Sequence, residues 1–211
     1  MVYGPRRLGS MDGPEGAGRQ AEARRETKET RVSVRINLDG TGKSEISTGL
    51  PFLDHMLTLA AAHGRLDLTL EAKGDLEVDG HHTVEDAGLT LGRALAAALG
   101  EKRGIHRYGQ SHVPMDEALA RAVVDLSGRP YLAYRVETGQ ERVGGFESGL
   151  AKEFFQALSN EARLTLHLDA WHGVSAHHTL EAVFKAFGRA LGQAVSLVSG
   201  STEVPSTKGV L

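Results

Sequence analysis

Polar and apolar residues alternate along the segment TRVSVRINLDGTGKSEI, which begins at Thr30. A period of two is typical of a β-strand with one buried face. The apolar positions of this strand are Val32, Val34, Ile36 and Leu38. The Asp39–Gly40 pair that follows is a turn signal, so the pattern predicts a β-hairpin here.

After this segment, the spacing of apolar residues changes from that of a strand to that of a helix. Apolar residues between Phe52 and Ala60 recur at helical spacing, with Pro51 in the first turn and Gly64 as a stop signal. A short strand with period two is predicted at Leu66–Leu70. A second helix is predicted to begin after Asp79, a residue type that favours the N-cap.

The same order of elements occurs twice. The motif DGHHTVEDAG at Asp79–Gly88 returns as SAHHTLEAVF at Ser175–Phe184, an offset of 177 − 81 = 96. The sequence GRAL repeats at the same offset, and RLDLTL matches RLTLHL at an offset of 98. Such self-similarity predicts a duplicated half-domain. We therefore expect an α+β fold made of two β-β-α-β-α units, each with its sheet covered by helices on one side.

These patterns divide the chain into four segments. Residues 1–26 are rich in Gly, Arg and Pro and are predicted to be a disordered tail. The first repeat is placed at 27–104 and the second at 105–200, with a C-terminal tail at 201–211. The second repeat is expected to take its hairpin from the segment ALARAVVDLSGRPYLAYRVE.

Composition excludes several classes of function. The 211 residues carry a formal charge of −3 and give a pI near 6.4, so bulk charge does not suggest nucleic-acid binding. The chain has no cysteine, which excludes disulfides and thiolate metal sites. No apolar run reaches the ~20 residues that a membrane span requires. The N-terminal residues lack the apolar region of a secretory signal, so we expect a cytoplasmic protein.

The repeated histidines are the strongest candidates for chemistry. On a helix, His81 and Glu85 are four residues apart and point to the same side, whereas His82 lies roughly 100° further round. The duplication predicts a reciprocal arrangement, in which one ion takes His81, Glu85 and His178, and another takes His177, Glu181 and His82. A single His pair in a first turn is most often solvated, but its repetition in register favours two metal sites. Imidazole and carboxylate ligands admit Mn, Fe, Co, Ni or Zn and favour Mn.

Eight motifs make the chain similar to a known family. They are NLDGTG, GLPFLDHML, DGHHTVEDAG, HRYG, DLSGRPY, EFFQAL, AHHTLEAVFKA and PSTKGVL. Together they resemble imidazoleglycerol-phosphate dehydratase, the dehydratase of histidine biosynthesis, from about Thr27 to Leu211. The resemblance implies conversion of D-erythro-imidazole glycerol phosphate to imidazole acetol phosphate and water. It also implies two Mn²⁺ ions per active site and a homo-oligomer of 24 subunits with sites between subunits.

The resemblance also assigns residues. The implied metal ligands are His55, His81, His82, Glu85, Glu153, His177, His178 and Glu181. Glu153 departs from the family, which usually has histidine at this position, and its partner in the first repeat is His55 (153 − 55 = 98). The implied acid/base residues are Glu29 and Glu181. The implied substrate-binding residues are Glu29, His55, His63, Arg107, Arg129, Ser206 and Lys208, with the cationic ones serving the phosphate.

Two other classes of function share these ligands. A two-metal hydrolase would use similar His and Glu ligands to activate water against an ester or amide. A non-enzymatic protein would use the metal only as a staple between subunits, without turnover. The arginines and the family motifs favour the dehydratase over both.

Overall fold

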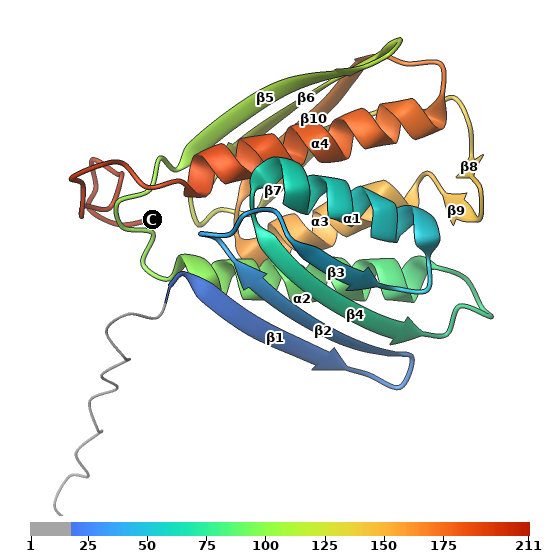
Figure 1. The fold of residues 1–211 in the computed structure, drawn as a ribbon, viewed down its shortest axis with the longest axis horizontal. Helices are drawn as coiled ribbons and strands as arrows, with labels where there is room; N and C mark the ends of the chain where they lie inside the picture. Colours follow the sequence, from blue (N-terminus) through green and yellow to red (C-terminus); the bar gives the residue numbers. More distant parts are fainter. Residues whose placement is uncertain (1–17) are drawn as a thin grey trace, which may run out of the picture.

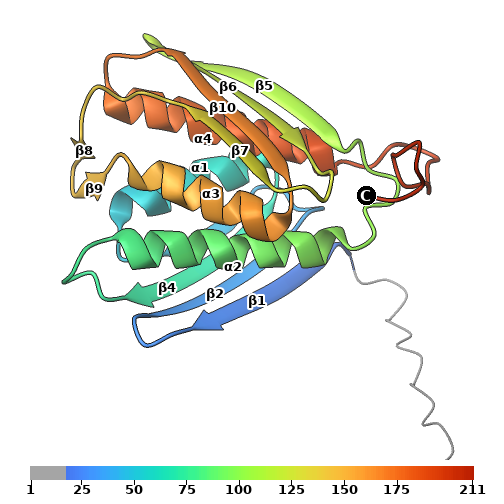
Figure 2. The same ribbon diagram turned by 180° about the vertical axis from the view of Figure 1, so that it is seen from behind.

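The alternating segments of the two repeats form two four-stranded β-sheets in the computed structural model, which describes residues 18–211. The four helices lie in a layer between the two sheets (Figures 1 and 2). Each sheet therefore has one face against helices and one face open. This arrangement follows from the sequence, because each strand has a single apolar side that must be buried.

The first half contains four strands and two helices. In chain order they are β1 (Gln20–Glu26), β2 (Thr30–Asn37), β3 (Ser44–Ser47), α1 (Pro51–Gly64), β4 (Asp67–Gly74) and α2 (His81–Leu99). The strand order in the sheet is β1-β2-β4-β3. Only β3 and β4 run parallel, and the other neighbours are antiparallel.

The second half repeats this topology. Its elements are β5 (Tyr108–Met115), β6 (Ala118–Asp125), β7 (Tyr131–Arg135), α3 (Leu150–Ala162), β10 (Thr165–His172) and α4 (Ala176–Val195). The strand order is β5-β6-β10-β7, which matches the first sheet position by position. A small extra hairpin of β8 (Arg142–Val143) and β9 (Phe146–Glu147) is inserted before α3 and has no counterpart in the first half.

The predicted α+β duplication is confirmed, but each unit is β-β-β-α-β-α, with one more strand than expected. The predicted hairpin turn at Asp39–Gly40 is wrong, because β2 and β3 are separated by β4. The carboxylate of Asp67 explains the path. Its Oδ1 accepts hydrogen bonds from the backbone N–H groups of Thr41, Gly42 and Lys43, at 2.8, 3.1 and 3.0 Å. The loop therefore wraps onto the start of β4 instead of returning along β2.

The hairpin partner of β2 is β1, which lies in the segment predicted to be a tail. Residues 1–17 of that segment lie outside the described residues, but Gln20–Glu26 pair with β2 along its length. The sequence of β1 contains only small apolar residues, Ala21 and Ala23, and therefore gives little strand signal. The same error occurs in the second half, where β6 forms its hairpin with β5 rather than with β7.

Helices from different halves pack in pairs, α1 against α4 and α2 against α3. Glycines bring their backbones together. A Cβ atom added to Gly188 would lie 2.3 Å from the carbonyl oxygen of Ala60, and one added to Gly88 would lie 2.6 Å from that of Phe154. Real Cβ atoms do not approach this closely, so the two helix pairs depend on these glycines. Aromatic rings fill the space nearby, with Phe155 and Phe184 4.7 Å apart between ring centroids.

Helices α2 and α4 are the longest among residues 18–211. Neither they nor the shorter helices there are long and apolar enough to cross a membrane.

Replacing Gly188 with alanine should destabilise the protein by about 1–3 kcal/mol, because the added methyl group meets backbone that cannot rotate away. Chemical denaturation of the wild type and the Gly188→Ala variant measures this loss. Gly145→Ala is the matched control, since nothing lies within 4 Å of a Cβ atom at that position. Equal stability of the two variants would contradict the packing described here.

Candidate active site

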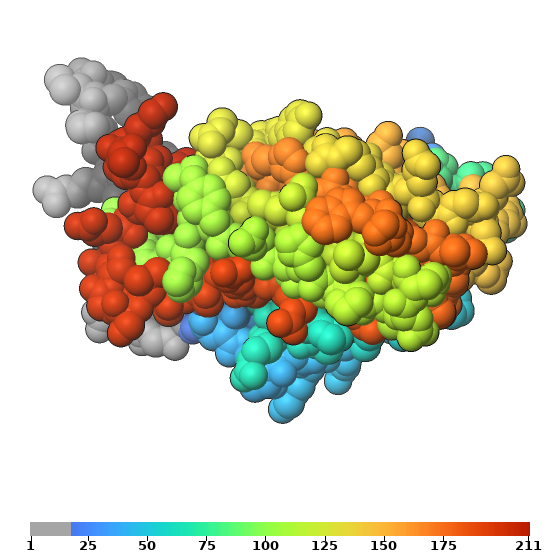
Figure 3. Space-filling model, turned by 90° about the horizontal axis from the view of Figure 1, so that it is seen from above, coloured from blue at the N-terminus to red at the C-terminus, as the bar shows by residue number. Residues whose placement is uncertain are grey.

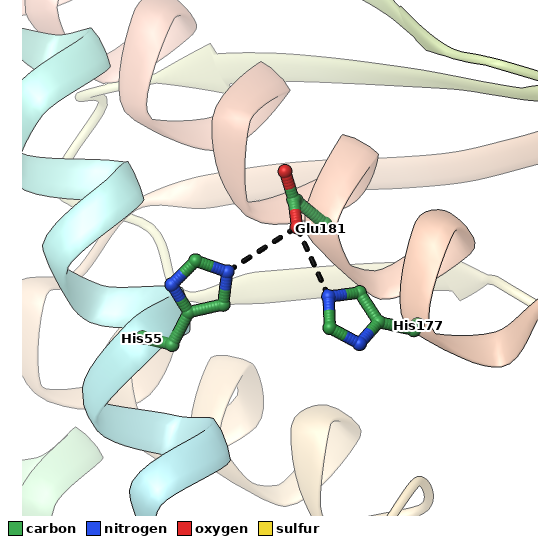
Figure 4. Close-up of side chains that lie close together, drawn as sticks. All are labelled: His55, His177 and Glu181. Carbon is green, nitrogen blue, oxygen red and sulfur yellow. Dashed lines mark hydrogen bonds and ion pairs between the residues drawn. The ribbon is translucent and has the colours of Figure 1, made fainter.

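Two histidines and a glutamate from different halves converge where α1 meets α4. His55 Nε2 lies 3.3 Å and His177 Nε2 lies 3.2 Å from Oε2 of Glu181 (Figure 4). One ligand atom from each of the three side chains lies within 4.8 Å of the others. We call this group the α1/α4 half-site.

Local sequence fixes the two ligands on α4. His177 and Glu181 are four residues apart and so share one face of the helix. The helix begins there because the Ser175 side chain accepts a hydrogen bond from the backbone N–H of His178. The ring of Phe52 meets the His177 imidazole edge-on, at 5.3 Å between centroids, and Phe146 of β9 packs behind Phe52 at 5.3 Å. These rings restrict the orientation of His177.

Glu181 is a buried carboxylate, with 6% of its surface exposed. Burial alone would raise the pKa of this carboxyl group. The ammonium of Lys185, one helical turn further along α4, together with the imidazoles of His55 and His177, outweighs burial and holds the pKa below its usual value. Glu181 is therefore ionised at neutral pH, with one oxygen facing Lys185 and the other facing the two histidines.

This donor set fits a divalent cation. Two imidazole nitrogens and one ionised carboxylate oxygen are borderline and hard ligands of the kind that Mn, Fe, Co, Ni or Zn accept. The absence of cysteine removes the softer alternatives. A buried carboxylate beside two imidazoles is also costly unless a cation is present, and Lys185 neutralises only one side of it.

The equivalent residues of the first repeat occupy the interface between α2 and α3. His81 Nε2 lies 3.9 Å from Glu85 Oε2, and a surface hollow lined by His81 and Glu153 places α3 opposite them. We call His81, Glu85 and Glu153 the α2/α3 half-site. These three do not come as close together as the α1/α4 group, which is the one compact metal-ligand cluster within residues 18–211.

The other two histidines among the implied metal ligands, His82 and His178, lie apart from both half-sites. His82 Nδ1 lies 3.0 Å from Asp75, and His178 Nδ1 lies 2.7 Å from Glu117. Hydrogen bonds to these carboxylates raise the pKa of both imidazoles. Within one chain, therefore, the histidines of the expected reciprocal arrangement do not meet, and that arrangement stays a prediction. His55, rather than His82, joins His177 and Glu181.

Glu29 lies in the turn between β1 and β2, at the same end of the molecule as the first turns of α2 and α4. Its carboxylate is exposed and lies 4.0 Å from Nδ1 of His82. The structure thus brings the implied acid/base residue next to an implied metal ligand, in the turn that closes the β1–β2 hairpin.

The implied phosphate-binding residues lie at the opposite end. Arg107 makes an ion pair with Asp125 at 2.8 Å and donates to the carbonyl oxygen of Pro205 in the C-terminal segment. Arg129, largely exposed, lies 3.6 Å from the same aspartate. The C-terminal segment 201–211, which contains Ser206 and Lys208, gathers at this end (Figures 1 and 3).

Two further residues lie near the sites without joining them. Burial lowers the pKa of the His63 imidazole, with contributions from the cations Lys185 and Arg189. His63 lines a surface hollow together with Arg189, and His55, His177 and Glu181 do not line it. Asp86, next to Glu85 in sequence, is directed inward and binds Arg25 Nε at 2.5 Å and the hydroxyl of Thr30. It therefore serves the β1–β2 hairpin and does not orient a histidine.

Sequence reasoning missed three residues that contact the site: Lys185, Asp75 and Glu117. The first had a usable signal, because Lys185 follows Glu181 at helical spacing in EAVFK. Asp75 lies in the loop between β4 and α2, and Glu117 lies in the turn between β5 and β6. Glu117 also accepts hydrogen bonds from the backbone N–H groups of Val174 and Ser175, so it anchors the loop before α4, and no spacing rule links these positions.

Comparison with known proteins agrees with this geometry. A family model described as imidazoleglycerol-phosphate dehydratase matches residues 48–191. The protein of that name from Bordetella petrii is 56% identical over 196 residues, which cover 92% of this chain and 100% of the relative. The one from Exiguobacterium sp. is 54% identical over 191 residues, covering 90% of this chain and 97% of the relative.

Solved structures of the same family also match this chain. The crystal structure of imidazoleglycerol-phosphate dehydratase from Staphylococcus aureus matches with a TM-score of 0.77 and 43% identity, covering 85% of this chain and 99% of that one. The structure from Pyrococcus furiosus matches with a TM-score of 0.77 and 42% identity, covering 89% and 99%.

The fold and the site define a duplicated α+β protein with a candidate cation site where its halves meet, and its relatives make it a hydro-lyase. The chain belongs to the imidazoleglycerol-phosphate dehydratase family.

The His178–Glu117 contact predicts a pH effect. Glu117→Gln should lower the pKa of His178, because the hydrogen bond to this carboxylate is the main cause of the raised value. The carboxyl of Glu117 has a pKa of about 2, below its ordinary value of 4.5, so the pair stabilises the fold fully only between about pH 4.5 and 6.5. This stabilisation is lost as pH rises through the raised pKa of His178, and also as pH falls from 4.5 toward the lowered pKa of Glu117. NMR titration of the metal-free protein measures this. The distant Glu45→Gln variant should leave the His178 titration unchanged, and an unchanged titration in Glu117→Gln would rule the contact out.

Proposed function

We propose that this chain is an Mn²⁺-dependent dehydratase that converts D-erythro-imidazole glycerol phosphate to imidazole acetol phosphate and water, in the cytoplasmic pathway to histidine. The observation that carries the proposal is the convergence of His55, His177 and Glu181 in a chain of this family. The names of its relatives support the substrate, and the donor set supports a divalent cation.

Two ions per site are proposed, one for each half-site. His55, His177 and Glu181 would hold one, and His81, Glu85 and Glu153 the other, with His82 and His178 completing the shells. Bound divalent cations supply Lewis acidity, which stabilises the anionic form of the substrate's imidazole ring. His82 and His178 must first release their protons and their carboxylate partners, Asp75 and Glu117.

Glu29 is proposed to remove the proton from the carbon next to the one that loses its hydroxyl. The hydroxyl leaves as water with a proton taken from solvent, and Glu29 returns its proton to solvent. The resulting enol then rearranges to the ketone. The exposed carboxylate of Glu29 lies 4.0 Å from Nδ1 of His82, and this proximity to a proposed metal ligand supports its role as the base. Glu181, ionised beside Lys185, is the second candidate for proton transfer.

The positions of the phosphate-binding candidates support a site shared between subunits. His177 lies in the first turn of α4, whereas the backbone N–H of Arg107 bonds to Ala194 near its last turn. Seventeen residues of α-helix span roughly 25 Å, which exceeds the length of one small substrate. Arg107, Arg129, Ser206 and Lys208 of one subunit would therefore bind the phosphate while another subunit supplies metal ligands. A closed assembly of 24 subunits satisfies this requirement.

His55 and His63 would line the ring end of the substrate. Both lie on α1 and face α4, His55 toward Glu181 and His63 toward Lys185 and Arg189. Because burial keeps His63 neutral, it offers one ring nitrogen as a hydrogen-bond donor and the other as an acceptor.

Metal dependence gives the first test. After chelation the protein should form no imidazole acetol phosphate, and added Mn²⁺ should restore turnover. Glu181→Gln removes the charge of the buried carboxylate while keeping its shape, so it should weaken Mn²⁺ binding at least tenfold and lower turnover with it. Isothermal titration and a product assay measure both. Tight Mn²⁺ binding without product would instead favour the staple or the hydrolase.

Glu29→Gln tests the acid/base role. It should lower kcat on the order of 10²–10⁴-fold, the usual contribution of a positioned general base, with little change in Mn²⁺ affinity. Glu26→Gln is the matched control, because Glu26 is also exposed and sits at the end of the same hairpin, where it pairs with Arg31. A Glu29→Gln enzyme with normal kcat would exclude Glu29 as the base.

A further inference from the structure

The two half-sites are related by the duplication but differ in charge. The pairing of α1 with α4 and of α2 with α3 makes His177 equivalent to His81 and Glu181 equivalent to Glu85, at the offset of 96. On the facing helices His55 is equivalent to Glu153, at the offset of 98. The hollow lined by both His81 and Glu153 agrees with this equivalence.

Two substitutions between the repeats alter the electrostatics. The first replaces the neutral ligand His55 with the carboxylate Glu153. The second concerns the residue one turn after the ligand glutamate, which is Lys185 on α4 and Leu89 on α2. Lys185 pairs with Glu181, whereas Glu85 has no lysine at the corresponding position.

The charges of the two half-sites follow directly. With neutral histidines, the α1/α4 half-site has a formal charge of zero, because Lys185 cancels Glu181. The α2/α3 half-site has a formal charge of −2, from Glu85 and Glu153. Of the other charged residues that line the hollow, Arg142 and Glu147 form an ion pair and are neutral in sum, and Glu141 adds a further negative charge. A divalent cation is therefore attracted more strongly to the α2/α3 half-site.

Shape and burial also differ between the two half-sites. Glu181 has only 8% of its side chain exposed and is held by both histidines, while 49% of the Glu85 side chain is exposed. Phe52 restricts His177, but the residue equivalent to Phe52 in α3 is Leu150, which leaves His81 without an aromatic neighbour of that kind. The α1/α4 half-site is rigid and neutral, and the α2/α3 half-site is open and anionic.

We propose that the two half-sites bind divalent cations in a fixed order, the α2/α3 half-site first and at least tenfold more tightly, and the α1/α4 half-site second. Glu153 and Lys185 set this order. The inference rests on the metal dependence of the proposed function. It adds that the second ion is the exchangeable one, held where Lys185 competes with it for the carboxylate of Glu181.

Titration of the metal-free protein with Mn²⁺, followed by the electron paramagnetic resonance signal of the free ion, tests the proposal without measuring turnover. We expect two classes of site per chain, differing at least tenfold in affinity. Glu153→His should weaken the tight class and bring the two within about threefold. Lys185→Met should tighten the weak class and leave the tight class unchanged.

Two controls distinguish the proposed effects of Glu153 and Lys185 on Mn²⁺ affinity from a general effect of charge and from a loss of folding. Glu147→Gln removes a carboxylate at the same hollow that is already neutralised by Arg142, so its isotherm should match the wild type within about twofold. Thermal unfolding of each metal-free variant identifies a fold that has been lost. Lys185→Met needs no new ligand, so it keeps the test decisive if Glu153→His does not fold.

The outcomes distinguish the two proposals. Equal affinities of the two classes in the wild type would overturn the ordered binding. So would a Glu153→His variant whose two classes differ in affinity as much as in the wild type. Mn²⁺-dependent turnover in either case would leave the dehydratase proposal standing. Absence of Mn²⁺ binding overturns both. If Glu181→Gln weakened the tight class of sites and Glu153→His did not, the tight site would be the α1/α4 half-site. That result would refute the proposed order of binding.

Discussion

The close backbone contact between helices of different halves is the constraint on which the site depends. Gly188 of α4 lies against the backbone of α1, and Gly88 of α2 lies against that of α3. Side chains on these helix faces can reach one another only because the helices approach so closely. His55 of the first half thereby meets Glu181 of the second. A bulkier residue at Gly188, about two turns along α4 from Glu181, separates the helices and moves the donor atoms apart.

Burial determines how the carboxylate of Glu181 interacts with cations. Water would weaken the attraction of its carboxylate for a cation, and its enclosure by His55, His177 and Lys185 keeps water away. The same enclosure makes the carboxylate depend on positive charge, from Lys185 or from a metal ion. The family relationship and the donor geometry thus support one another, since both point to a hydro-lyase with a candidate site for a divalent cation.

Much of this architecture could be predicted from the sequence, and the failures have physical causes. Period-two and helical patterns located the strands and helices that bury apolar residues, and the repeated His-His-x-x-Glu motif located both half-sites. The strand β1 was missed because Ala21 and Ala23 bury too little to produce a pattern. The hairpin at Asp39–Gly40 was misassigned because the distant Asp67 determines the path of that loop. The pairing of His55 with His177 also depends on which helices cross, and that is decided by glycines whose partners lie over a hundred residues away.

The duplication also has a consequence for symmetry. Each half covers the helical face of the other, so a half on its own would expose an apolar surface and would need a second copy of itself to cover it. The present chain therefore has the form of a two-fold dimer joined end to end. In a dimer of identical chains every substitution occurs twice, once on each side of the axis. Joining the copies removes that restriction, which is why the inserted β8–β9 hairpin, Glu153 and Lys185 can each exist on one side alone.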